Sequence, residues 1–189
     1  MLQTSRRFAE DRGFTLAEVC VAIVLLALAV AGVAQMISFA KRATWAARVQ
    51  TTATILATQK LEQLRSLLWN VDAAGQRLSD VVTDLSRQPP TNGGAGLGAS
   101  SAGAIDANTP GYVDFLNGRG EWVGTGSTAP PTATFIRRWS IRPLPEDPAD
   151  TLILQVLVTT VTGDRHAPTP RRRLGQDALV TTMLSRKLR

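Results

Sequence analysis

The stretch that decides the fold is residues 12–40, which read RGFTLAEVCVAIVLLALAVAGVAQMISFA. No side chain from residue 19 to residue 34 is polar, and up to residue 40 only Gln35 and Ser38 interrupt the apolar run. A helix over residues 14–40 would be about 40 Å long at 1.5 Å per residue, enough to cross a hydrocarbon layer of about 30 Å. This length predicts a membrane-spanning helix, because the core helix of a soluble domain rarely needs it.

The composition around this stretch fits one small domain. The chain has 189 residues, of which 44% are apolar and 19% charged, which excludes both a large multidomain enzyme and a disordered chain. The formal net charge is +6, and most of the excess comes from residues 171–189, where six basic side chains accompany one acidic side chain. We interpret that stretch as a solvated terminus. Cys20 is the single cysteine, so an intrachain disulfide is excluded.

Physical arguments leave three interpretations of residues 1–40 open. The segment is a membrane anchor, a secretory signal peptide cut after Ala29 or Ala31, or a core helix of a soluble domain. A plain anchor does not explain Glu18, because a carboxylate at the centre of a bilayer would cost about 3 kcal/mol. Glu18 is therefore the first candidate for a functional side chain.

Residues 12–18, Arg-Gly-Phe-Thr-Leu-Ala-Glu, resemble the processing motif of type IV pilins and type II secretion pseudopilins. In that family a short basic leader ends in glycine, cleavage follows the glycine, and a glutamate is fifth in the mature chain. The resemblance implies cleavage between Gly13 and Phe14, N-methylation of Phe14, and a role in assembly for Glu18. The leader, residues 1–13, takes its positive charge, which suits retention in the cytoplasm, from Arg6, Arg7 and Arg12.

The same resemblance implies the partners and the location. A prepilin peptidase would cut the chain, and an inner-membrane assembly platform would add it to other pilin or pseudopilin subunits through the N-terminal helix. Before assembly the chain would span the inner membrane once with its head outside the cytoplasm, and afterwards it would belong to a pilus or pseudopilus. Major pilins commonly carry a proline at the position of Gln35, so this departure favours a minor subunit. The long-loop head and its strand over residues 134–139 look more like the PilV-like group than like a major pilin.

The helix is expected to continue beyond the membrane, to about Leu68. Residues 14–40 would form the transmembrane and filament-core half, and residues 41–69 an amphipathic half with Lys41, Arg48, Lys60 and Glu62 away from its apolar stripe. The apolar stripe of the second half consists of Trp45, Val49, Ala53, Leu56, Ala57, Leu61, Leu64 and Leu68.

The rest of the chain predicts a β-rich head. Residues 70–132 form an irregular Gly- and Pro-rich region with a flexible loop at 92–103 and a small hairpin around Asn117-Gly118. Residues 133–189 form an antiparallel β head with a basic C-terminus, with strands expected at 135–141, 151–161 and 178–184 and with Leu152, Leu154, Val156 and Val158 facing the helix. The predicted fold class is α+β, a pilin-like lollipop with a long helix on an antiparallel sheet.

The sequence offers no pattern for an active site. The single histidine, His166, lies in a polar loop with no nucleophile pattern, and we expect no catalytic residue, cofactor or metal site. The aromatic and basic residues of the head are interpreted as cross-strand packing with exposed arginines, so nucleic-acid binding is not expected; they are Trp122, Trp139, Arg137, Arg138 and Arg142.

The predicted function is that of a non-enzymatic minor pilin or minor pseudopilin. One alternative is a binding module that is anchored in the membrane or released by signal peptidase. A second alternative is a competence pilin that contacts DNA. The sequence does not decide between a pilus, a secretion pseudopilus and a competence pilus.

Overall fold

The computed structural model describes residues 13–166 and 177–186. The leader arginines Arg6, Arg7 and Arg12 and five of the six basic residues of the C-terminal stretch lie outside these ranges. The chain divides into two compact units, residues 1–45 and residues 46–189. Helix α1 (Leu16–Ser66) contains most of the described part of the first unit and also the first element of the second, and it ends two residues before the predicted Leu68.

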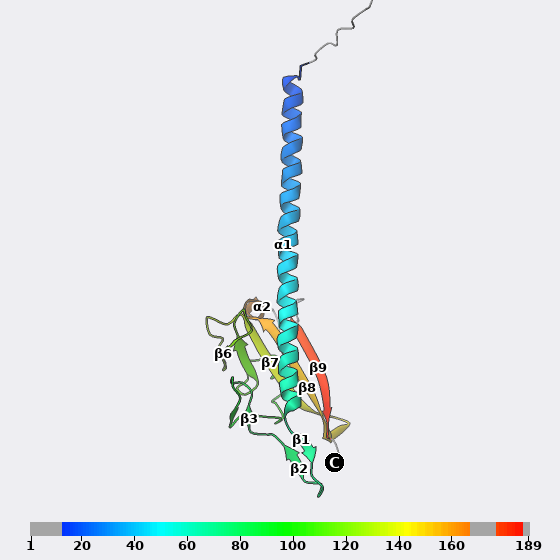
Figure 1. Cartoon of the computed structure of the whole chain (residues 1–189), viewed down its shortest axis with the longest axis vertical. Helices are drawn as coiled ribbons and strands as arrows, with labels where there is room; N and C mark the ends of the chain where they lie inside the picture. Colours follow the sequence, from blue (N-terminus) through cyan, green and yellow to red (C-terminus); the bar gives the residue numbers. More distant parts are fainter. Residues whose placement is uncertain (1–12, 167–176, 187–189) are drawn as a thin grey trace, which may run out of the picture. The chain divides into compact units, whose positions relative to one another are not determined.

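A five-stranded antiparallel sheet organises the second unit (Figure 1). Its strand order is β6-β5-β7-β8-β9, and the three strands predicted for the C-terminal head are confirmed as its last three members. The predicted hairpin is also confirmed, but β5 pairs with β7 on its other side, so the hairpin extends the main sheet. The strand bounds are β5 (Val113–Leu116), β6 (Trp122–Gly124), β7 (Phe135–Leu144), β8 (Asp147–Thr160) and β9 (Ala178–Ser185).

The C-terminal part of α1 packs on one face of this sheet, so the predicted α+β class is confirmed (Figure 1). Alternation along β8 turns every second side chain toward the helix, and the face predicted for this contact is buried in the core that the helix shares. The other face of the sheet carries a smaller core of Val113, Phe115 and Ile136, against which Val161 of α2 (Val161–His166) packs. The buried residues shared by helix and β8 are Ala53, Leu56, Ala57, Leu61, Leu64, Leu152, Leu154, Val156 and Val158.

The apolar stripe predicted for α1 is too long at both ends. Trp45 and Leu68 are 59% and 52% exposed, and the fully buried part of the stripe runs from Ala53 to Leu64. The helix therefore contacts the sheet over about three turns. The earlier part of the helix, up to residue 45, is exposed throughout.

The position of Lys60 corrects the sequence analysis, which placed this side chain on another face. Lys60 is 1% exposed and lies on the buried stripe, where its Nζ donates to the Leu85 carbonyl oxygen (2.6 Å) and contacts Asp114 Oδ2 (2.8 Å). Its ammonium also lies 4.3 Å from the centre of the Trp139 ring, a cation–π geometry. Burial lowers the pKa of Lys60 to about 8, partly offset by the attraction of Asp114.

Arg137 and Arg138 are likewise buried, although the sequence analysis expected exposed arginines. Arg137 makes a bidentate contact with Asp114 (2.9 and 2.8 Å) and donates to the Leu56 carbonyl oxygen of α1 (3.2 Å). Arg138, on the other face, makes a bidentate contact with Asp164 of α2 (2.7 and 2.8 Å). Both arginines can be buried in the sheet because each guanidinium donates two hydrogen bonds to a carboxylate partner.

The glycine-rich segment is packed, which corrects the prediction of a flexible loop. It begins with β4 (Thr91–Asn92), which pairs with β3 (Thr83–Asp84), and the Gly94 amide then donates to the Val82 carbonyl oxygen (2.6 Å). A Cβ on Gly94 would overlap the backbone of Asp84, so the close approach of the two segments requires glycine there. A second small ribbon, β1 (Trp69–Val71) with β2 (Arg77–Ser79), follows the end of α1.

Candidate functional site

The candidate site is the segment around Gly13, Phe14 and Glu18, where α1 begins. Gly13 to Thr15 precede the helix, and Phe14 is 87% exposed. A Cβ built on Gly13 would meet no other atom within 4 Å. The described structure therefore gives no packing reason for glycine at position 13.

Thr15 and Glu18 form a reciprocal cap on the first turn of α1. The Thr15 amide donates to Glu18 Oε2 (3.0 Å), and the Thr15 hydroxyl donates to the same oxygen (3.1 Å). The Glu18 amide in turn donates to Thr15 Oγ1 (3.3 Å). This is a capping box, which satisfies amides that the first helical turn would otherwise leave unpaired. The sequence analysis missed it, although a threonine three residues before a glutamate is its usual sequence pattern.

The capping box places the Glu18 carboxylate beside the bond that the resemblance predicts to be cut. Both members of the box follow the Gly13–Phe14 bond, so the box would survive cleavage. Glu18 accepts a hydrogen bond from the Thr15 backbone amide. The preceding backbone nitrogen is that of Phe14, which cleavage would convert to an amine. The structure thus brings Glu18 to the start of the predicted mature chain and accounts for its position locally, as a helix cap.

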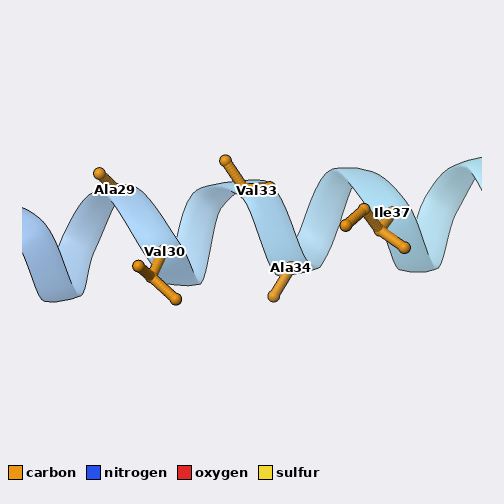
Figure 2. Close-up of a pocket in the computed structure, with 5 residues that line it drawn as sticks. All are labelled: Ala29, Val30, Val33, Ala34 and Ile37. Atoms are coloured by element: carbon orange, nitrogen blue, oxygen red, sulfur yellow. The ribbon is translucent and has the colours of Figure 1, made fainter.

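After Glu18 the helix presents only apolar and small side chains for several turns. Every residue from 13 to 45 is exposed, and α1 is long and apolar enough to cross a membrane. Figure 2 shows five residues of this part of α1 whose side chains are hydrocarbon and project from a single helix, namely Ala29, Val30, Val33, Ala34 and Ile37. Alanines between branched residues allow another helix to approach closely.

The other residues considered for function are not gathered into a site. Trp139 is 1% exposed, Arg137 and Arg138 are held in ion pairs, and Arg142 is exposed and donates to Gln155 (2.9 Å). These side chains therefore do not form the exposed basic and aromatic surface that nucleic acid would need. The His166 side chain lies outside the described part of the structure. Within residues 13–166 and 177–186, no three His, Cys, Asp or Glu side chains are grouped as metal ligands would be.

Comparison with known proteins identifies the N-terminal segment. Residues 10–34 match the family model described as the prokaryotic N-terminal methylation motif. Searches of curated proteins and of solved structures gave no significant match. The matched residues include Gly13, Phe14 and Glu18, and they run into the long helix whose later turns pack on an antiparallel sheet. This match supports a place for the chain in the type IV pilin and pseudopilin superfamily.

Proposed function

We propose that the chain is a minor pilin or minor pseudopilin, a non-enzymatic subunit of a type IV pilus or a type II secretion pseudopilus. A prepilin peptidase cuts it between Gly13 and Phe14, Phe14 is N-methylated, and the mature chain enters the filament through α1. Residues 1–13 are the leader, and residues 14–40 are first a membrane anchor and then part of the filament core. The observation that carries the proposal is the methylation motif at the start of an exposed apolar helix.

The proposed role of Glu18 follows from the charge that cleavage creates. The new amine of Phe14 would be surrounded by apolar helices in a filament, where an unpaired ion costs several kcal/mol. Because Glu18 already contacts the adjacent Thr15 nitrogen, its carboxylate is within reach of the amine of its own chain. We propose that this pairing neutralises the mature N-terminus and allows it to leave the lipid headgroups for the filament core.

The assignment to the minor subunits rests on Gln35. Helix α1 passes through this position without interruption, whereas a proline there would remove a backbone donor and bend or open the helix. We propose the PilV-like group on the basis of the head and its strand over residues 134–139. The partners of the chain would be a prepilin peptidase, other pilin or pseudopilin subunits and an inner-membrane assembly platform.

Two substitutions at Glu18 separate its two roles. Glutamine can still accept hydrogen bonds from Thr15 and so cap the helix, but it carries no charge that could neutralise an amine. Alanine can neither cap the helix nor neutralise the amine. We expect Glu18→Gln and Glu18→Ala to be cleaved as the wild type is and to be similarly depleted from sheared filaments. The measurement is the ratio of filament-associated to membrane-associated protein, by immunoblot, in cells that express the native assembly machine.

A matched control tests the cap without touching the charge. Thr15→Val removes the hydroxyl that Glu18 binds and leaves the carboxylate in place. We expect this variant to enter filaments at close to the wild-type level. If Glu18→Gln also assembled normally, the charge would have no role in assembly; if Thr15→Val were lost as severely as Glu18→Ala, helix capping would explain the defect.

A further inference from the structure

From the turn of α1 that follows the apolar segment, we infer a binding site for anionic phospholipid headgroups formed by Lys41, Arg42 and Trp45. The inference rests on the proposed function, because it needs residues 14–40 to cross the membrane and residue 41 to emerge from it. It adds a second, electrostatic contact between the unassembled subunit and the bilayer.

The three residues share one face of the helix. Lys41 is four residues before Trp45 and Arg42 is three residues before it, the two spacings that make side chains neighbours on a helix. Long side chains on a helix lean toward its N-terminus, and this end of α1 leads into the apolar segment. In a membrane-spanning α1, this tendency would lean both cations and the indole back toward the headgroup layer.

Trp45 has no packing role in the described structure. It is 59% exposed, whereas Trp139 is 1% exposed and Trp69 and Trp122 are half-buried. An exposed indole beside an apolar span is typical of residues at the boundary between lipid and water, where the ring contacts acyl chains and the N–H remains hydrated. The position of Trp45, five residues after Ala40, fits this boundary.

The charge around the site favours a phosphate partner. Between Glu18 and Glu62 the chain has no acidic residue, and Lys41 and Arg42 make no ion pair with any described residue. Both side chains are exposed, so their charges are available to a partner. Lys and Arg bind phosphate oxygens by charge-assisted hydrogen bonds, and near an anionic leaflet each cation strengthens association roughly fivefold.

The full-length protein in mild detergent, incubated with equal amounts of phosphatidylglycerol and phosphatidylcholine, tests this site by native mass spectrometry. We expect the wild type to retain phosphatidylglycerol roughly 25-fold in preference to phosphatidylcholine, from two cations at the strength given above. Lys41→Gln with Arg42→Gln should retain the two lipids nearly equally. The charge-conserving pair Lys41→Arg with Arg42→Lys should keep most of the preference.

A control pair removes the same charge from the head. Arg77 and Arg119 are exposed, and replacing both by glutamine should leave the preference for phosphatidylglycerol unchanged. Equal retention of the two lipids by the wild type would overturn the proposed site, and so would an unchanged preference after Lys41→Gln with Arg42→Gln. If that variant kept its lipids but failed to enter filaments, the partner would be an acidic protein surface and the lipid site would be wrong.

The same samples distinguish this inference from the proposed function. Membranes from the expressing cells are washed with alkaline carbonate before the detergent is added. A wild-type chain that is extracted by carbonate does not span the membrane, which refutes the proposed anchor and the lipid site together. A chain that resists carbonate but shows no lipid preference refutes the lipid site alone.

Discussion

Replacing Asp114 by asparagine is predicted to destabilise the head more than any other single change in its buried charges. Asp114 is 1% exposed, and its carboxylate is shared by Lys60 of α1 and Arg137 of β7, with Oδ2 at 2.8 Å from each. Asparagine has nearly the same shape but carries no charge. The substitution therefore leaves two buried cations facing each other across the contact between helix and sheet.

The size of the effect follows from the cost of an uncompensated buried charge. Removing one partner of a buried ion pair typically costs about 3–5 kcal/mol. Loss of the Lys60 proton would remove one of the two buried charges. Deprotonating a lysine of ordinary pKa costs about 4.6 kcal/mol at pH 7, so the contribution of Lys60 to the destabilisation cannot exceed that value. We expect Asp114→Asn to lower the free energy of unfolding by about 3–5 kcal/mol.

Lys60→Met is the informative comparison. It removes one cation but leaves Asp114 with its bidentate contact to Arg137, so its main cost is the unpaired Leu85 carbonyl oxygen, about 1–3 kcal/mol. In the double variant the methionine relieves the repulsion that asparagine creates. The double variant should therefore be no less stable than Asp114→Asn alone, rather than less stable by the sum of both effects.

Urea unfolding of the detergent-solubilised full-length protein measures these differences. Tryptophan emission is a suitable signal, because Trp139 lies in the core, 4.3 Å from the Lys60 ammonium. A loss below about 1 kcal/mol in Asp114→Asn, or additive losses in the double variant, would show that the three charges do not act as one buried group.

Two further predictions concern the head. The pKa of Lys60 is lowered to about 8 in the folded state, so the unfolded chain binds more protons than the folded chain between about pH 8 and pH 10.5. The contribution of Lys60 to stability is therefore largest above that window and falls as the pH drops toward 8. The free energy of unfolding of the wild type minus that of Lys60→Met, measured by thermal unfolding, should change by about 1 kcal/mol per pH unit in this range. A difference that does not change with pH would contradict the burial of a charged Lys60. Gly94→Ala should lower the free energy of unfolding by about 1–3 kcal/mol because its Cβ would overlap the Asp84 backbone. The control Gly103→Ala, with a φ of 80° but open space around it, should cost only about 1 kcal/mol by urea unfolding, and a loss in Gly94→Ala no larger than that would contradict the steric overlap at Gly94.

Periodic patterns predicted the elements of this fold well. The alternation along β7 and β8 located both strands and the face that contacts α1, because the period of two is imposed by the strand itself. The motif around Gly13 and Glu18 could also be predicted from local sequence, because its residues lie close together in the chain and need no tertiary contact to be recognised. The capping box was equally local and was open to prediction from Thr15 and Glu18.

Buried charges were predicted poorly, because their burial depends on partners distant in sequence. Lys60 lies four residues after Leu56 and three after Ala57, so its spacing already placed it on the buried stripe, and only its charge argued against burial. What permits the burial is Asp114, which sequence proximity does not connect to Lys60. Arg138 and Asp164 are a second example, since the pair joins the middle of β7 to a short helix after β8.

The glycine-rich segment was misjudged for a different physical reason. Glycine is common both in flexible chain and where two backbones approach closely, and composition does not distinguish the two. In this chain Gly94 and Gly96 donate to the carbonyl oxygens of Val82 and Thr83, and Leu97 is 2% exposed. The segment is thus held by backbone hydrogen bonds that no local sequence pattern predicts.

The central claim is that this chain is processed as a prepilin, and the mass of its mature N-terminus tests that claim most directly. Protein purified from cells with and without an active prepilin peptidase is digested and its N-terminal peptide is sequenced by mass spectrometry. With the peptidase, the N-terminal peptide should begin at Phe14 and carry a methyl group on its amine; without the peptidase, the leader through Gly13 should remain. A mature chain that keeps Met1 in the presence of the peptidase, or that begins after Ala29 or Ala31, would contradict the claim.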